Sequence, residues 1–308
     1  MKIPKLIKII ISLLILLILI KIVGPEKLLE IILNINLIYI IPVVIIYILT
    51  FFIAAWNINI LLNGIKTKIV FKKLLRYTII SWSLGLVSPG KIGDFSMVYF
   101  LKKEKVKIGS GFGIVLIDKA ITLFVLLLFA LLTTVILLTK KDFFIVLVII
   151  ILAFFGTIII LNKKTREIIR HKILGKYSKN FKGFYKTIEF IIKNNKKELT
   201  YNFLVTILKW VISGINVLFI FLGLGASGNL VLITLISASL IIFNLVPITF
   251  HGIGLKEAAG IYLYGLIGIS GEVVIVTYII FNILAYSVAA ISSYFLAEEI
   301  EKIISLRR

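Results

Sequence analysis

Long runs of apolar residues decide what this chain can fold into. Hydrophobic residues make up 60% of its 308 residues, and the mean hydropathy is +1.14, far above that of soluble proteins. An α-helix rises about 1.5 Å per residue, so about twenty apolar residues cross the ~30 Å hydrocarbon core of a bilayer. We therefore predict an all-α polytopic membrane protein. The predicted spans cover residues 6–23, 38–62, 110–139, 143–162, 200–223 and 272–297.

The first run also resembles a signal peptide, because three lysines precede its apolar residues. No small-x-small cleavage pattern follows it, and Gly24-Pro25-Glu26 is typical of a turn. We therefore favour a first span that is retained.

Two further apolar stretches, about 74–101 and 227–268, are broken by glycine, proline and charge. The first break reads SPGKIGD at residues 88–94, and the second reads PITFHGIGLKE at residues 247–257. Backbone that leaves the helix inside hydrocarbon must be satisfied by protein or by water in a cavity. A pair of broken segments in the two halves of a chain is typical of a transport site.

The distribution of basic residues predicts the orientation. A net charge of +21 would suggest nucleic acid as the partner of a soluble protein, but in a membrane protein it is typical of cytoplasmic loops, so we predict no nucleic-acid partner. Lysine and arginine cluster in residues 2–8, 66–76, 102–107, 163–197 and 302–308. With all these clusters inside, the chain is a multi-pass protein of the cell membrane with both termini cytoplasmic.

This orientation predicts an inverted repeat. Both flanks of the stretch 74–101 are basic, so it enters from the cytoplasm and returns, whereas the stretch 227–268 enters from outside and returns. Residues 1–140 and 141–308 then each hold three transmembrane helices and one re-entrant helical hairpin, with the two tips meeting near the midplane. The alternative is that both broken stretches cross the membrane fully.

The segment 163–199 differs from the predicted spans. Apolar residues recur at helical spacing between Phe181 and Ile192, and lysines occupy another face. We predict an amphipathic helix that contacts the anionic surface of the cytoplasmic leaflet. A solvated linker helix is the alternative.

The two breaks hold the candidate translocation site. Their glycines permit unusual backbone conformations, and a helix that starts after each break would point its N–H groups toward the tip. Asp94 and Glu257 would lie in the first turns of those helices, while Lys91, His251 and Lys256 would meet an anionic head group. The predicted site residues are Pro89, Gly90, Lys91, Gly93, Asp94, Pro247, His251, Gly252, Gly254, Lys256 and Glu257. The alternative is that the carboxylates are only caps and the glycines only hinges.

Other charged and metal-binding candidates are few. Asp118 and Lys119 form a secondary polar cluster, with a structural ion pair as the alternative, and Lys209 is suited to snorkelling. The chain has no cysteine and two histidines far apart in sequence, so we predict neither a metal site nor a cofactor. No catalytic triad or P-loop is visible, so no catalytic residue is predicted.

Residues 86–94, 115–119 and 244–257 together resemble a known family. Their motifs are similar to the paired P-G-x-x-G-E and P-x-x-x-G-G-x-G-x-x-E motifs of the lysylphosphatidylglycerol synthase transmembrane-region family, which is often described as flippase-like. This chain has Asp94 where Glu is usual, His251 for the first Gly of the pair, Lys119 where Arg is frequent and Thr122 where Asp often follows. The last two departures put a third polar cluster in doubt.

The resemblance implies translocation of a membrane lipid, either a phospholipid or a polyisoprenyl phosphate, rather than its synthesis. Longer members of the family carry a soluble aminoacyl-transfer domain, for which this chain leaves no room after its last span. We therefore expect a flippase-like translocator of an anionic lipid head group and no enzyme. The alternatives are an intramembrane transferase acting on a lipid or lipid-linked glycan, and a membrane scaffold that transports nothing.

Overall fold

The computed structural model describes residues 5–139, 147–148, 183–245, 248–250 and 252–305, and these contain helices and no strand. The helices are α1 (Lys5–Val23), α2 (Pro25–Leu33), α3 (Ile40–Gly64), α4 (Phe71–Val87), α5 (Met97–Lys103), α6 (Ile108–Leu137), α9 (Phe184–Asn194), α10 (Lys196–Gly223), α11 (Leu230–Leu240), α12 (Leu255–Gly265) and α13 (Gly271–Ser305). Three short 3-10 segments join them: η1 (Leu37–Tyr39), η2 (Pro89–Ser96) and η5 (Ile241–Leu245).

Four of the helical segments are long and apolar enough to cross a membrane. They are Leu37–Gly64, Ile108–Leu137, Lys196–Gly223 and Gly271–Ala297, and they coincide with four of the six predicted spans. The first predicted span is a helix too, but its apolar part, Ile10–Val23, is shorter. The predicted span at 143–162 lies outside the described residues except for 147–148. The chain is thus a multi-pass, all-helical membrane protein, as predicted.

The segment after the first span is more ordered than its turn signal predicts. Gly24 does form a turn, with φ of 101°, between α1 and α2. The chain then continues as α2, because Pro25 at the first helical position has the φ that a helix requires. Lys27 of α2 lies 3.8 Å from Glu272 at the start of α13 and so links the two helices.

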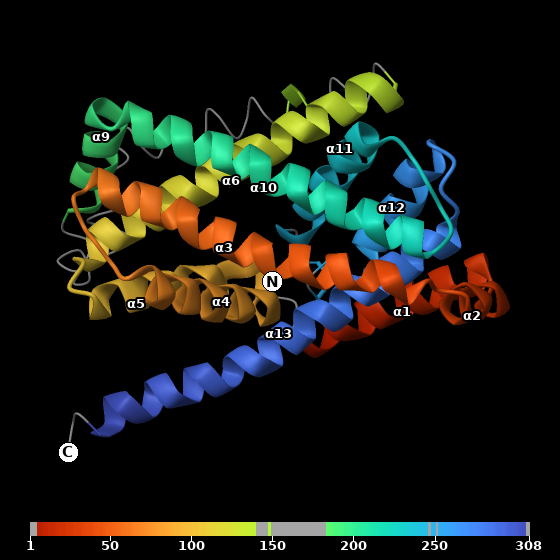
Figure 1. The fold of residues 1–308 in the computed structure, drawn as a ribbon, viewed down its shortest axis with the longest axis horizontal. Coiled ribbons are helices and arrows are strands. Elements are labelled where there is room, and N and C mark those ends of the chain that lie inside the picture. The colour runs from red at the N-terminus through yellow and green to blue at the C-terminus, as the bar shows by residue number, and fades with distance from the viewer. Residues whose placement is uncertain (1–4, 140–146, 149–182, 246–247, 251, 306–308) are drawn as a thin grey trace.

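Each broken stretch forms two short helical arms joined by irregular backbone. In the first, α4 and α5 are joined by η2, and in the second, α11 and α12 are joined by η5 and the residues up to Gly254. The arms of each pair contact one another. The two pairs lie toward opposite ends of the molecule, with their irregular segments toward its middle (Figure 1).

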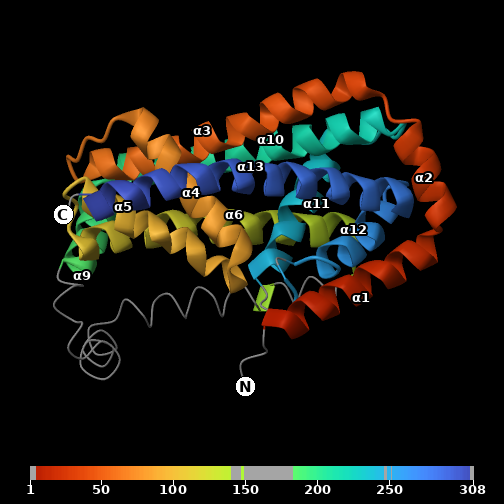
Figure 2. The same ribbon diagram turned by 90° about the horizontal axis from the view of Figure 1, so that it is seen from below.

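The two halves of the chain pack with matching sets of neighbours. The helices α3 and α10 pack against one another along much of their length (Figures 1 and 2). The arm α4 packs on α13 from the second half, and the arm α11 packs on α6 from the first. Likewise, α5 contacts α6, and α12 contacts α13. The long helices α6 and α13 therefore each contact one arm from their own half and one arm from the other half.

Small residues allow the arms to pack closely. A Cβ at Gly214 of α10 would overlap the side chain of Thr234 on α11. A Cβ at Gly260 of α12 would lie 3.1 Å from Val274 of α13. In a bilayer the hydrophobic effect does not drive helices together, because lipid tails are as apolar as the side chains. Close packing at these glycines therefore supplies the van der Waals contact between the helices.

Helix α9 covers part of α6. Phe184, Ile188 and Ile191 are buried in the same apolar cluster as residues of α4, α5 and α6, and the Thr187 hydroxyl donates to Ser110 Oγ at 2.9 Å. Much of the apolar face predicted to meet the leaflet therefore packs on protein, while Ile192 remains 44% exposed. Leaflet contact stays a prediction, and residues 163–182 lie outside the described part of the chain.

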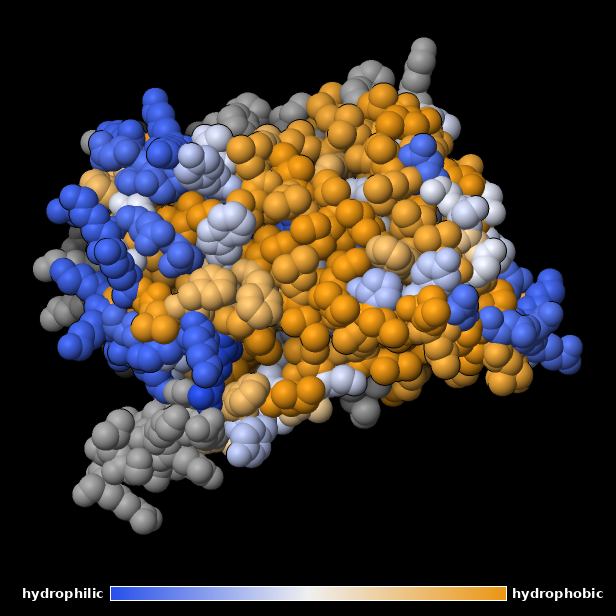
Figure 3. All heavy atoms as spheres, viewed as in Figure 1, coloured by the Kyte–Doolittle hydropathy of each residue, from blue (hydrophilic) through white to orange (hydrophobic). Residues whose placement is uncertain are grey.

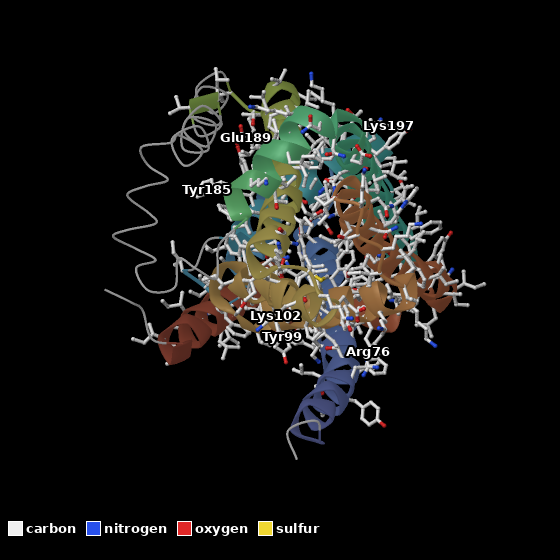
Figure 4. All side chains as sticks on the ribbon, turned by 90° about the vertical axis from the view of Figure 1, so that its left-hand side faces the viewer. Arg76, Tyr99, Lys102, Tyr185, Glu189 and Lys197 are labelled. Carbon is white, nitrogen blue, oxygen red and sulfur yellow. The ribbon has the colours of Figure 1, made fainter. Side chains whose placement is uncertain are left out.

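Hydrophilic side chains gather at the ends of the molecule. In the space-filling view, an apolar band covers the middle, and blue residues concentrate at the end that holds α9 (Figure 3). Seen from that end, Arg76, Lys102 and Lys197 lie on three different helices around the rim (Figure 4). This distribution fits a protein that exposes its middle to lipid.

At this basic end, Glu104 ties the two arms of the first broken stretch together. Its carboxylate accepts hydrogen bonds from Lys73 Nζ at 3.0 Å and from the Tyr77 hydroxyl at 2.8 Å. Burial raises the pKa of Glu104, but the bonds from Lys73 and Tyr77 outweigh it and hold the pKa below its ordinary value of 4.5.

A pH dependence of stability follows. The pKa of Glu104 is lower in the folded state than in the unfolded state. Its contribution to the free energy of unfolding is therefore complete above the unfolded-state pKa and is lost as the pH falls through the folded-state pKa. We expect Glu104→Gln to lower the apparent Tm in detergent at pH 7, and the deficit to close as the pH is lowered below 4.5. A deficit that stays constant with pH would show that the carboxylate charge is not responsible.

Candidate functional site

The irregular segments of the two broken stretches touch. We define tip one as residues 88–96 and tip two as residues 241–254. The segment η2 of tip one contacts η5 of tip two, and a Cβ at Gly90 would lie 3.5 Å from the carbonyl oxygen of Leu245. Residues about 150 positions apart are thus neighbours, as the sequence analysis predicted for the tips.

Tip one is a tight reversal that folds back onto the end of α4. Gly90 and Lys91 both adopt left-handed backbone conformations, with φ of 60° and 57°. The second is unusual for a residue with a side chain. Ser88 Oγ accepts a hydrogen bond from the Gly93 N–H at 2.7 Å. A Cβ at Gly93 would overlap the carbonyl of Leu84, so this position requires glycine for close approach rather than for its φ.

Asp94 lies in the 3-10 turns that follow the kink at Gly90 and Lys91, and α5 begins three residues later, at Met97. It is thus near the start of a helical segment but not in α5 itself. The Asp94 carboxylate packs on Gly85 of α4, where a Cβ would overlap it. Its Oδ2 atom lies 3.1 Å from Lys119 Nζ on α6, and its buried Oδ1 atom has no hydrogen-bond partner.

Asp118 and Lys119 belong to the same group of charges as tip one. Lys119 Nζ lies between two carboxylates, 3.1 Å from Asp94 and 3.7 Å from Asp118. The predicted secondary cluster and the first predicted site are therefore joined by one ammonium group. The Lys119 side chain retains 40% exposure, so its charge is not fully enclosed by protein.

Polar residues of α3 and α10 extend this group. Asn202 Nδ2 donates to Asp118 Oδ1 at 3.4 Å and to the Asn57 carbonyl at 3.0 Å, and Asn57 Nδ2 donates to Thr206 Oγ1 at 3.0 Å. Sequence reasoning missed these residues. Asn202 and Thr206 lie four apart in an apolar run, which places them on one helix face.

Tip two is built around Glu257. Gly252 and Gly254 adopt positive φ values of 72° and 88°. Glu257 lies in the first turn of α12, as predicted, and its Oε2 atom accepts a hydrogen bond from the Gly254 N–H at 2.6 Å. The residue is only 1% exposed, and its Oε1 atom has no hydrogen-bond partner. The carboxylate is thus a cap with one acceptor still unused.

Helix α1 covers tip two from another side. The Phe250 N–H donates to Ser12 Oγ at 2.8 Å, and a Cβ at Gly254 would lie 2.8 Å from Ile15. The predicted site residues Pro247 and His251 lie outside the described residues.

Two further lysines, Lys256 and Lys91, belong to the charged group. Lys256 is buried, and its Nζ lies 4.6 Å from the ring centroid of Tyr278 on α13. Lys91 of tip one lies within electrostatic range of Lys256 as well as of Asp94 and Lys119.

Lys209 lies within electrostatic range of the same charged group, whereas the sequence suggested that it would snorkel toward the membrane surface. Its charge interacts with those of Asp118, Lys119, Lys91 and Asp94, and its Nζ lies 5.0 Å from the ring centroid of Trp210. The signal in the sequence was a lysine in the middle of an apolar run.

The combined group has a formal excess of one positive charge. Four lysines (Lys91, Lys119, Lys209 and Lys256) lie within electrostatic range of three carboxylates (Asp94, Asp118 and Glu257). The described residues hold no group of three or more His, Asp or Glu side chains suited to a metal ion. An excess ammonium group in a low-dielectric setting favours an anion as the missing partner.

Residues 5–293 of the chain match the family described as Lysylphosphatidylglycerol synthase TM region. No curated protein and no solved structure matches the chain. The match covers both tips, three of the four long apolar helices and most of the fourth, Gly271–Ala297.

Proposed function

We propose that this chain, which belongs to the Lysylphosphatidylglycerol synthase TM region family, is a translocator that moves an anionic lipid head group across the membrane. Membership of this family supports a lipid-related role in a membrane. The lysines and carboxylates of the candidate site support the more specific proposal that the lipid is anionic and is moved across the membrane. The head group is that of a phospholipid or of a polyisoprenyl phosphate, because both present a phosphate to the protein.

One observation carries the proposal: the two tips are in contact, and their surroundings hold more ammonium groups than carboxylates. A phosphate that entered between the tips would meet Lys91 of tip one and Lys256 in the first turn of α12, directly after tip two. Ammonium–phosphate contacts are strong where water is excluded. The carboxylates of Asp94 and Glu257 keep the unloaded site from being purely cationic.

We further propose an inverted repeat of two re-entrant helical hairpins. The matching neighbours of the two halves support it, since α4 packs on α13 as α11 packs on α6. In transporters built from inverted repeats, the site lies at the repeat interface and one repeat rocks against the other. With the basic end in the cytoplasm, the end of α13 lies on that side, whereas α1 begins near the middle of the molecule (Figures 1 and 2). A cytoplasmic N-terminus stays a proposal that rests on the basic residues before the first span.

In this scheme the residues have separate roles. Lys119 holds Asp94 and Asp118 in place and adds positive charge beside tip one. Glu257 fixes the backbone of tip two through the Gly254 N–H, and its negative charge acts on the neighbouring Lys256. Lys91 and Lys256 attract the phosphate. The hydrocarbon tails remain in the bilayer throughout, because only the polar head needs a protein environment to cross.

Leaflet exchange in liposomes tests the proposal. The purified chain is reconstituted with a fluorescent phosphatidylglycerol, and exchange is followed by dithionite quenching of the outer leaflet. We expect exchange above that of empty liposomes, with a clear loss in the double variant Asp94→Asn/Glu257→Gln. Glu30→Gln, an exposed carboxylate on α2, is the matched control. Equal exchange in the wild type and in empty liposomes would count against translocation of this lipid.

A further inference from the structure

A set of buried hydroxyl groups lies in the second broken stretch and on the long helix beside it. Thr234 and Ser237 lie on α11, Tyr264 lies on α12 and Tyr278 lies on α13, and each residue is at most 8% exposed. We call these four residues the hydroxyl series. The two tyrosines belong to the apolar cluster formed by α10, α11, α12 and α13. A hydroxyl in apolar surroundings costs free energy unless it is hydrogen-bonded, so four of them together call for an explanation.

Two members of the hydroxyl series have no hydrogen-bond partner within the described part of the chain. These are the hydroxyls of Thr234 and Tyr264, and the Oε1 atom of Glu257 lacks a partner in the same way. Inside proteins, unpartnered polar atoms are positions where water binds or where a group has a chemical role. These three oxygens therefore mark candidate positions for water or for an exchanging proton.

Tyr278 connects Glu257 with Tyr264. Glu257, Gly260 and Tyr264 lie on one face of α12, because residues three, four and seven apart in a helix point to the same side. Gly260 makes room for the tyrosine ring, since a Cβ at this position would lie 3.0 Å from Tyr278 Cε2. Tyr278 thus packs at the level between Glu257 and Tyr264, which are about 10 Å apart along the helix axis. It is within electrostatic range of both.

Ser237 connects Tyr264 with the end of the molecule opposite α9, which we call the far end. The Tyr264 hydroxyl lies near Ser237 of α11, and Ser237 Oγ donates to the carbonyl oxygen of Thr234 at 3.0 Å. Thr234 is about one turn from the start of α11, where Asn229 and Leu230 are exposed. The start of α11 lies toward the far end (Figure 1). The hydroxyl series therefore leads from Glu257 toward the surface at the far end.

Hydroxyl groups are suited to passing a proton through apolar surroundings. Each one is both a donor and an acceptor, so it can take up one proton and release another without keeping a charge. The titratable groups that interact with Glu257 are Lys256 beside it and Tyr278 and Tyr286 on α13. The segments α11 and η5 also pack on α12 and contain no titratable residue, and α1 reaches tip two with the neutral Ser12. Glu257 is thus the acidic group at the inner end of the hydroxyl series.

We propose that the hydroxyl series carries a proton between the far end and Glu257, and that the lipid head group moves together with this proton. Each hydroxyl ends with the proton count that it had at the start, and Glu257 becomes a neutral carboxylic acid. The ammonium group of Lys256 then has no negative charge beside it, which strengthens its attraction for a phosphate. Release of the proton to water at the basic end restores the carboxylate. The inference rests on the proposed function and adds its energy source, a proton gradient.

A pH gradient across liposomes tests the coupling. The full chain is reconstituted with a short-chain fluorescent phosphatidylglycerol, and extraction by albumin measures its distribution between the leaflets. With the outside about one pH unit more acidic, movement of one proton with each lipid favours the inner leaflet by up to about tenfold at equilibrium, whichever way the protein is oriented. Collapse of the gradient by nigericin is expected to restore an even distribution. Exchange in the wild type that does not respond to the gradient would overturn the coupling and leave the translocator standing.

Infrared difference spectroscopy tests the path independently of transport. After a rapid change in pH, the C=O band of a protonated carboxylic acid appears or disappears, and its absence in Glu257→Gln assigns it. We expect Tyr264→Phe and Thr234→Val to slow this change by about threefold or more. The matched controls Tyr262→Phe, on the exposed face of α12, and Thr78→Val, on α4, should leave it unchanged. Equal rates in all variants, or no band that belongs to Glu257, would overturn the path. Slowed protonation without any lipid exchange in the wild type would contradict the proposed function and keep the path.

The stability of the same variants separates a proton path from a structural role. Thr234→Val and Tyr264→Phe each remove an unpartnered hydroxyl from apolar surroundings, so we expect an unchanged or higher apparent Tm. Thr78→Val removes a hydroxyl that donates to the Leu74 carbonyl at 2.8 Å and should lower the apparent Tm. Slower protonation that is accompanied by a lower Tm in both Thr234→Val and Tyr264→Phe would indicate a structural role and contradict the proton path.

Discussion

Replacement of Glu257 by Gln is expected to lower lipid exchange by about tenfold or more while leaving the fold nearly unchanged, a tenfold loss being equivalent to about 1.4 kcal/mol. The reason lies in the two oxygens of this carboxylate. One accepts the Gly254 N–H and holds the start of α12, and the other has no hydrogen-bond partner. The carbonyl oxygen of Gln can still accept the N–H, so this substitution removes the charge and keeps the cap.

Glu257→Ala is the informative comparison because it removes both the charge and the cap. Loss of a helix cap costs about 0.5–2 kcal/mol, so this variant should show a lower apparent Tm as well as lower exchange. If the carboxylate were only a cap, Gln would retain full exchange and Ala would lose it in proportion to its loss of stability. Exchange rates and Tm measured on the same preparations distinguish these two patterns.

Local sequence properties were sufficient to predict much of the architecture. Hydropathy located four long helices, because the bilayer requires an unbroken run of apolar residues in a hydrogen-bonded helix. Glycine and proline located both breaks, because the two residue types together disfavour the interior of a helix. The segment 25–33 was missed, since its glutamates and lysine resemble those of a polar loop. It is helical because Pro25 starts it and Leu28 packs it against α13.

The candidate site could be predicted only in part, since it depends on contacts between distant residues. The glycines and Glu257 act within their own segment, so their local roles could be inferred from spacing. Asp94 depends on Lys119, which lies 25 positions away on a different helix. No local pattern indicates which lysine a carboxylate will meet. For the same reason Lys209 and Asn202 were not associated with the site before the structure placed them near Asp118.

The pairing of Lys119 with two carboxylates leads to the second large expected effect. Lys119→Met leaves Asp94 and Asp118 without the ammonium group that separates them, and like charges that face one another in a low-dielectric setting are strongly unfavourable. We expect lipid exchange to fall by about tenfold or more and the apparent Tm to fall as well. Because the Lys119 side chain is 40% exposed, the loss of stability should be smaller than for a fully buried pair.

A second substitution separates the structural consequence from the functional one. Lys119→Met/Asp94→Asn removes the repulsion together with the cation, so the apparent Tm should recover toward that of the wild type. Exchange should not recover, because the positive charge that favours a phosphate near tip one is still missing. Lys119→Arg keeps that charge and should retain most of the exchange. Recovery of both stability and exchange in the double variant would mean that Lys119 serves only to neutralise the carboxylates. The anion would then have to be bound by Lys91, Lys209 and Lys256 alone.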